Sequence, residues 1–335
     1  MRIAFLTLLL ICQIPSAVLA QATSPVPPVP NYPRVNRTPW YAVDESWPQT
    51  PAESERTAVS GIAVDAKNQV YVFTRSNPPV QIYAQDGKYI RGWGQGVVEQ
   101  SHHMKLDPKG NVWLADIGNH TIRQFTPEGN LLLTLGIPGE FGEDERRLSQ
   151  PTDVVVSPQG DIFVSDGYGN NRIVHFDAKG KFVKQWGQMG TEPGDFCNPH
   201  AISIDSQGRL YVADRYNGRI QVFSQAGELL DVWDDVVIPW GLWITPDDHV
   251  WVCGSSPDAW PADPMVSRGG KPRDQLLMKF NTSGKLLQLW NVPLGGAETL
   301  PGQLNLVHCL AVDHDGNIYC GDILGKRAQK FVPRK

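Results

Sequence analysis

The sequence predicts an all-β protein whose fold class is a six-bladed β-propeller. Three observations predict it: a unit of roughly 40 residues occurs six times, each unit holds up to four short strand-like segments, and no segment shows an α-helical period. The 335 residues include 32 glycines and 27 prolines, a content that favours many short strands and turns. With 41% hydrophobic and 19% charged residues, the chain can bury a sizeable core.

The first two strands of each unit are joined by a tight turn, and the units align on the residue that opens this turn. In the unit that begins at His200, Gln207-Gly208 turns the chain and Leu210-Tyr211-Val212 is β-branched and aromatic, as expected for a strand. The six turn residues are Asp65, Asp107, Ser157, Asp205, Thr245 and Asp313. The interval before the last of them is the longest, and it marks an insertion at 255–275 whose Pro, Gly and Asp content predicts a loop over one face.

A third strand, and in most units a fourth that ends in Trp-Gly or a similar pair, complete the pattern. Examples are IVHF and KQWG in the third unit. The last unit stops at its third strand, QKFV, which would leave an exposed sheet edge. We expect TPWYAVDESWP, residues 38–48, to supply the missing strand and so to close the ring.

The N-terminus predicts export. Met1-Arg2 is followed by an apolar run from Ile3 to Ile14 and by the small-residue site Val18-Leu19-Ala20, which together are typical of a cleaved signal peptide at 1–20. The apolar run, about a dozen residues, is too short to span a bilayer comfortably, which favours a cleaved signal over the alternative of an uncleaved anchor. Residues 21–38 form a proline-rich linker, and 39–335 form the propeller. The predicted location is secreted or periplasmic.

Charge and cysteine content bear on the possible binding partners and on possible disulfides. A net charge of −5 provides no basic surface for nucleic acid, and no further transmembrane run follows the signal. The sequence favours no particular oligomeric state. Four cysteines remain after the signal, and in an oxidising compartment they allow three pairings between which the sequence does not choose: Cys197, Cys253, Cys309 and Cys320.

One position in the repeat carries most of the histidine signal. Five residues before each turn residue lies what we call the axial position, because it opens the innermost strand, which lines the central channel. The six axial residues are Ser60, His102, Thr152, His200, Trp240 and His308. Histidine occupies this position only in units two, four and six, and alternate blades of a six-bladed ring are related by about 120°. Three imidazoles should therefore converge on the channel axis.

Three converging imidazoles are the donor set of a tri-histidine metal centre with an open fourth position. Zinc suits this set, and copper, iron and nickel also bind imidazole. The competing interpretation is that each histidine only hydrogen-bonds a neighbouring strand, but its recurrence in alternate units favours a metal. A one-residue shift would put His103 in the axial position, whereas the turn at Asp107 favours His102.

Three further residues are predicted on the same face. Ten positions after the turn residues of units one and four come Arg75 and Arg215, whose guanidiniums could bind a carboxylate-bearing substrate bidentately. Tyr168 follows the equivalent position of unit three, where a metal and cationic groups could lower its pKa towards a general-base role. Each could instead have a local role, as an ion pair or a turn cover.

Four aspartates that end second strands are expected to hold turns by accepting backbone hydrogen bonds: Asp116, Asp166, Asp214 and Asp322.

A family resemblance adds to this interpretation. The chain resembles the NHL-repeat propellers and, more closely, the peptidyl-α-hydroxyglycine α-amidating lyases (peptidylamidoglycolate lyases). The segments that carry this likeness are residues 151–187, NPHAISI and ADRYNGRIQ. The likeness covers residues of about 40 to 332. It implies a zinc-dependent lyase that cleaves the C–N bond of a hydroxyglycine-extended peptide, or of a similar small molecule with a carboxylate, to an amide and glyoxylate. The family's zinc-binding histidines match His102, His200 and His308, its active-site arginines match Arg75 and Arg215, and its proposed base matches Tyr168.

The sequence departs from that family at two sites. Cys309 stands where the family has an aspartate that binds a structural Ca²⁺, and the other calcium contacts are backbone carbonyls at positions matching Ile62 and Met104. This replacement places the calcium ion in doubt. Ser149 and Gly169 stand where the family has a disulfide beside the tyrosine.

Two other function classes fit the same fold. One is a non-catalytic NHL-repeat propeller that binds a protein or a glycan, which predicts no stoichiometric metal. The other is a metal-dependent hydrolase of the lactonase kind, which typically uses acidic and amide ligands, so the three axial histidines argue against it.

Overall fold

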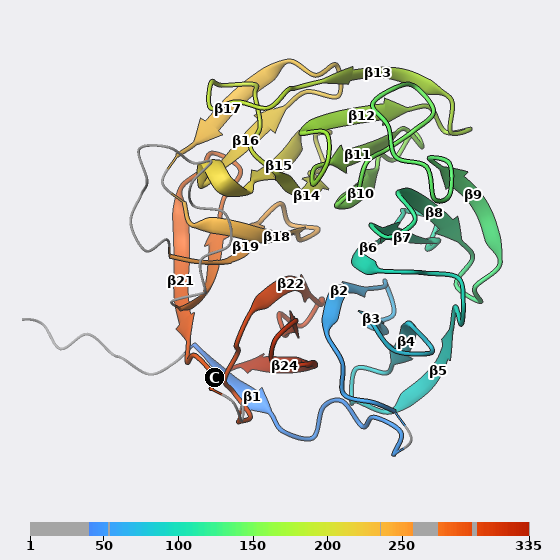
Figure 1. The fold of residues 1–335 in the computed structure, drawn as a ribbon. Helices are drawn as coiled ribbons and strands as arrows, with labels where there is room; N and C mark the ends of the chain where they lie inside the picture. Colours follow the sequence, from blue (N-terminus) through green and yellow to red (C-terminus); the bar gives the residue numbers. More distant parts are fainter. Residues whose placement is uncertain (1–39, 53, 235, 257–273, 297–299, 335) are drawn as a thin grey trace, which may run out of the picture. The chain divides into compact units, whose positions relative to one another are not determined.

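Repeated strand–turn–strand units form six antiparallel sheets of four strands each in the computed structural model. The structure describes residues 40–334 except 53, 235, 257–273 and 297–299. The predicted signal peptide and linker, and most of the predicted insertion at 255–275, lie outside the described residues. Figure 1 shows the six sheets arranged around a central axis, as the repeat predicts.

Each of the first five sheets takes four consecutive strands, with the first strand innermost. The first three sheets consist of β2 (Val59–Val64), β3 (Val70–Thr74), β4 (Val80–Tyr83) and β5 (Tyr89–Trp93); β6 (Ser101–Leu106), β7 (Val112–Asp116), β8 (Thr121–Phe125) and β9 (Leu131–Leu135); and β10 (Asp153–Val156), β11 (Ile162–Asp166), β12 (Arg172–Phe176) and β13 (Phe182–Trp186). The next two consist of β14 (Pro199–Ile204), β15 (Leu210–Asp214), β16 (Arg219–Phe223) and β17 (Leu229–Trp233); and β18 (Ile238–Ile244), β19 (Val250–Ser255), β20 (Gln275–Phe280) and β21 (Leu286–Val292).

The sixth sheet joins the two ends of the described chain. It contains β22 (Val307–Val312), β23 (Ile318–Asp322) and β24 (Arg327–Pro333), and its outer strand is β1 (Tyr41–Asp44). β1 runs antiparallel to β24, with Val43 opposite Phe331. The predicted closure of the ring by the N-terminal segment is therefore confirmed.

Apolar packing is concentrated between neighbouring blades. Six buried clusters each join two adjacent sheets; one of them packs Phe163 and Ile173 of the third sheet against Ile202 and Leu210 of the fourth. The innermost strands contact one another in the closed circuit β2, β6, β10, β14, β18, β22 and back to β2. This arrangement leaves the polar ends of the inner strands to meet at the axis.

The turns after the second strands are held as predicted. Asp214 accepts a hydrogen bond from the backbone N–H of Cys197 at 2.7 Å and pairs with Arg219 Nε at 2.8 Å. Asp166 makes the equivalent contacts: it accepts a hydrogen bond from the backbone N–H of Ser149 at 2.8 Å and pairs with Arg172 Nε at 2.9 Å. Among the described residues, the one helical element is a 3₁₀ turn, η1 (Arg215–Asn217). No helix in this part of the chain is long and apolar enough to cross a membrane.

Candidate metal centre

A bulge in the innermost strand places the axial residue. In the pairing of β14 with β15, Pro199 lies opposite Asp214 and Ala201 opposite Ala213, so His200 is an extra residue between them. The same register shift falls at the axial residue of three other sheets, Ser60, Trp240 and His308, and in the second sheet it spans His102 and His103. A bulge bends a strand and redirects a side chain, and bulges are common beside active sites. The repeat predicts the position but not the bulge.

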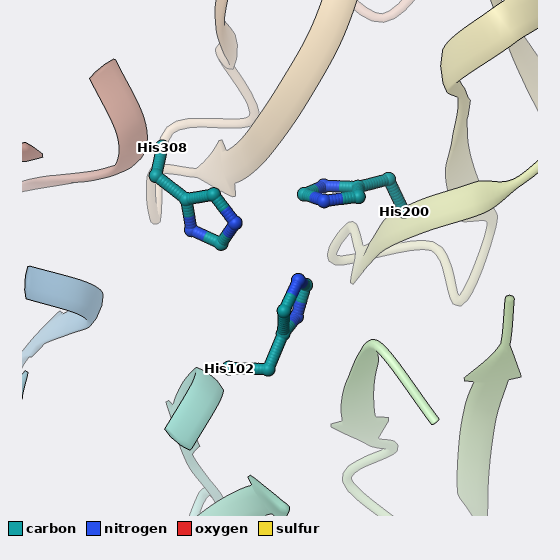
Figure 2. A group of neighbouring side chains, drawn as sticks. All are labelled: His102, His200 and His308. Atoms are coloured by element: carbon teal, nitrogen blue, oxygen red, sulfur yellow. The ribbon is translucent and has the colours of Figure 1, made fainter. Parts of the chain in front are cut away.

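The three axial histidines converge from β6, β14 and β22 (Figure 2). The ring centroids of His102 and His200 lie 4.7 Å apart, those of His102 and His308 4.7 Å, and those of His200 and His308 5.0 Å. One ring nitrogen from each histidine lies within 4.8 Å of the other two, and all three residues are buried. The predicted convergence of alternate blades is therefore confirmed, and it is His102, rather than His103, that belongs to the cluster.

The second ring nitrogen of each histidine is fixed by the blade that follows. His102 Nδ1 lies 2.6 Å from the carbonyl oxygen of Thr152, and His200 Nδ1 lies 2.6 Å from that of Trp240. His308 Nδ1 lies 2.7 Å from the carbonyl oxygen of Ser60. A carbonyl only accepts hydrogen bonds, so each Nδ1 carries the proton and each Nε2 is the unprotonated nitrogen with a lone pair. Metal-binding histidines are oriented in this way, and the three donors therefore fit a zinc ion.

The environment keeps these imidazoles neutral. Burial is the main cause that lowers the pKa of each histidine well below its usual value. The neighbouring imidazoles lower it further, and so do the guanidiniums of Arg75 and Arg215. Neutral imidazole is the form that binds a metal.

The Tyr168 hydroxyl lies at the histidine cluster, 3.0 Å from Nε2 of His102 and 3.0 Å from Nε2 of His200. Gly167 makes this approach possible, because a Cβ at that position would lie 2.0 Å from the carbonyl oxygen of Pro199. Burial raises the pKa of Tyr168, while Arg215 and Arg75 act in the opposite direction. The sequence predicts a lowered pKa for Tyr168. The protein's own groups raise this pKa instead, because the effect of burial outweighs that of the two arginines.

Both predicted arginines lie on this face. The backbone N–H of Arg75 bonds to the carbonyl of Ala58, and that of Arg215 to the carbonyl of Asn198, each two residues before an axial residue. The Arg215 guanidinium lies 4.8 Å from the ring centroid of Tyr216 and 6.0 Å from that of Trp240, and its Nε is buried without a hydrogen-bond partner. Arg75 is exposed. A buried, unpaired guanidinium N–H beside the cluster is suited to an anionic group.

Sequence reasoning missed a second polar group in the channel. Lys105 on β6 and Asp153 on β10 lie 3.3 Å apart, and His103 Nδ1 lies 3.6 Å from the same Asp153 carboxylate. A signal was available: Lys105 is a charged residue three positions after an axial residue, where the other units carry Ala, Val, Ser or Trp.

The departures from the lyase pattern have local consequences. Ser149 and Gly169 lie side by side, with the N–H of Gly169 bonded to the carbonyl of Ser149 at 3.0 Å, so a backbone hydrogen bond links the two segments. Cys253, Cys309 and Cys320 are buried as free thiols.

The chain is similar to known proteins at the level of repeat, sequence and fold. The NHL repeat family matches residues 148–176 and 196–223. NHL repeat-containing protein 3 of Homo sapiens is 30% identical over 314 residues, which cover 88% of this chain and 84% of that protein. A probable peptidyl-alpha-hydroxyglycine alpha-amidating lyase of Caenorhabditis elegans is 33% identical over 193 residues, which cover 50% of this chain and 55% of that one.

Among solved structures, a streptogramin B lyase superimposes with a TM-score of 0.58 at 14% identity, covering 89% of this chain and 100% of that one. At this identity the likeness concerns the fold alone.

Proposed function

Because the chain belongs to the NHL-repeat family of β-propeller proteins and carries a buried cluster of three axial histidines, we propose that it is a metal-dependent carbon–nitrogen lyase. The proposed substrate is an α-hydroxyglycine-type compound, peptide or small molecule, and the products are an amide and glyoxylate. Similarity to amidating lyases supports the reaction class. The observation that carries the proposal is that all three Nδ1 atoms are tied to backbone carbonyls, which leaves three Nε2 donors facing one point.

His102, His200 and His308 would hold the metal, for which zinc is the proposed ion. When bound, Zn²⁺ supplies a Lewis acid for a substrate oxygen. The Arg215 guanidinium, with its buried free Nε–H, is placed to bind the substrate carboxylate, and Arg75 contributes positive charge from the first blade. Both cations also favour negative charge that develops during the reaction.

Tyr168 is the proposed proton acceptor. Its hydroxyl lies within hydrogen-bond distance of two Nε2 atoms of the cluster. In the reaction Tyr168 would act as the phenolate, a form that a bound Zn²⁺ and the two arginines would favour against the effect of burial, and the substrate hydroxyl loses its proton to it as the carbonyl of glyoxylate forms. The electron pair of the broken C–N bond passes to the amide nitrogen, which takes up the proton that Tyr168 has accepted.

The proposed compartment is outside the cytoplasm, secreted or periplasmic. It rests on the charged start, the apolar run and the small-residue cleavage site within residues 1–20.

The metal assignment is tested with His200→Ala and with His314→Ala as a matched control, since His314 is an exposed histidine in the sixth blade. We expect purified wild type and His314→Ala to contain about one zinc per chain and to release glyoxylate from a hydroxyglycine peptide. His200→Ala should lose both and keep its far-UV circular dichroism. Wild-type protein without stoichiometric metal would support a binding propeller instead, and glyoxylate release by His200→Ala at the wild-type rate would exclude the metal mechanism.

A further inference from the structure

The ammonium group of Lys105 reaches from the second blade to the fifth. Lys105 Nζ lies 2.8 Å from the carbonyl oxygen of Leu242, 3.3 Å from Ser203 Oγ and 3.3 Å from Asp153 Oδ2. An ammonium group has three N–H donors, and here each has an acceptor. The acceptors belong to β18, β14 and β10, while the lysine belongs to β6. One side chain therefore joins the innermost strands of four consecutive blades.

The carboxylate of Asp153 is fully buried, and each of its two oxygens has a polar partner. Its Oδ2 faces Lys105 Nζ, accepts the backbone N–H of Ile202 at 3.1 Å and faces His103 Nδ1 at 3.6 Å, while Oδ1 accepts the N–H of Val154 at 2.9 Å. A buried carboxylate is costly unless it is paired and hydrogen-bonded. Burial alone would raise the pKa of Asp153, but Lys105 and His103 lower it overall, so the group stays anionic.

The same region does not fit the calcium ion that the lyase resemblance implies. A cavity of about 10 Å³ is lined by Ile62, Met104, Lys105 and Cys309, among others, and has room for about one water molecule. Ca²⁺ needs six to eight oxygen ligands, with carboxylates prominent among them. Here Cys309 brings a sulfur atom, the nearby carboxylate of Asp153 is paired, and the Lys105 ammonium would repel a second cation.

We propose that Lys105 is a built-in structural cation of the channel, which takes the place of calcium and joins the inner strands of blades two to five through Asp153, Ser203 and Leu242. The proposal is independent of the lyase reaction, because it concerns the channel wall and not the reacting groups.

The first test measures calcium directly. We expect the mature chain, loaded with zinc and dialysed against calcium-free buffer, to contain no calcium by elemental analysis and to keep the same melting temperature when millimolar calcium chloride is added. One calcium per chain, or a higher melting temperature with calcium, would overturn the proposal. This test uses the wild-type chain and does not require any variant to fold.

The second test changes the cation. Lys105→Met leaves Asp153 buried without its cation and should lower the melting temperature by roughly 5–15 °C. Lys109→Met, which removes an exposed lysine from the next turn, should leave it within about 2 °C of wild type. Equal melting temperatures for the two variants would contradict the proposal.

The third test restores a calcium site. In Lys105→Met combined with Cys309→Asp, a carboxylate lines the cavity and the carboxylate of Asp153 has lost its cation, so calcium chloride should raise the melting temperature of this variant while magnesium chloride does so less. A double variant that shows no response to calcium would argue against Lys105 as the substitute cation. Glyoxylate release is not measured here, so failure of the lyase assignment and failure of this proposal are separate results.

Discussion

Each histidine of the cluster uses its two ring nitrogens for different purposes. Nδ1 donates to a backbone carbonyl of the following blade, and Nε2 faces the channel. Because the acceptor is main chain, the side chain that carries it is free to vary, and indeed the three acceptor residues are Ser60, Thr152 and Trp240. The odd-numbered blades thus contribute to the site without sharing a residue type.

The low pKa of the histidines predicts how the metal-free protein responds to acid. In the folded chain the three imidazoles resist protonation, whereas in the unfolded chain they take up protons below about pH 6.5. The unfolded state then binds more protons, so the free energy of unfolding falls as the pH falls, by up to about 1.4 kcal/mol per pH unit for each histidine. Above about pH 7 this contribution is constant.

Urea unfolding of the metal-free protein at intervals between about pH 7.5 and pH 5 measures this slope. The slope should be smaller in His308→Gln than in wild type, by up to about 1.4 kcal/mol per pH unit, because one of the three histidines is removed. Equal slopes in the two proteins would show that the axial histidines are not the groups that titrate.

Tyr168→Phe tests the proton-transfer role. The variant keeps the aromatic ring and loses the hydroxyl that lies between His102 and His200. We expect kcat for glyoxylate release to fall by about 10²–10⁴-fold with the metal content unchanged. Tyr216→Phe, a change on the ring against which Arg215 packs, is the matched control and should retain most of the activity. Loss of metal in Tyr168→Phe would instead assign the hydroxyl to holding the centre.

At the scale of the element, stability lies in the contacts between sheets. Among the residues that the structure describes, each of the six apolar clusters belongs to two neighbouring blades and none is confined to a single blade. Repeat proteins of this kind gain stability mainly from interfaces between neighbours. In a ring, one of these interfaces has to join the last blade to the first, and β1 completes the outer edge of that last blade.

The buried tyrosine of β1 allows a prediction of how much the closure of the ring contributes to the free energy of unfolding. Tyr41 is buried and stacks on Trp290 with ring centroids 5.2 Å apart, whereas its neighbour Trp40 is 61% exposed. Tyr41→Ala should lower the free energy of unfolding by about 3 kcal/mol, and Trp40→Ala should change it by less than about 0.5 kcal/mol. Denaturant unfolding midpoints of the two variants check this. If both variants unfold at the wild-type midpoint, β1 is dispensable for closure.

At the scale of the whole molecule, the repeat explains which features could be predicted from sequence. His102, His200 and His308 were predictable because they share one position in the repeat, and the fold carries that position to the axis. The contact of Lys105 with Leu242 was not, since it joins side chain to main chain across the channel and occurs in one unit only. The bulge at the axial position depends on hydrogen-bond register, which an alternating pattern of apolar residues does not encode.

The alternation of ligand and acceptor around the ring also has a consequence for biogenesis. His102 and His200 find their acceptors in the blade that is made next, but His308 finds its acceptor at Ser60, in the first blade to be synthesised. The third ligand can therefore be oriented only after the last blade has docked on the first. For the metal site proposed above, capture of the ion would then be a late event in maturation, and a nascent or truncated chain with an incomplete ring would bind the ion poorly.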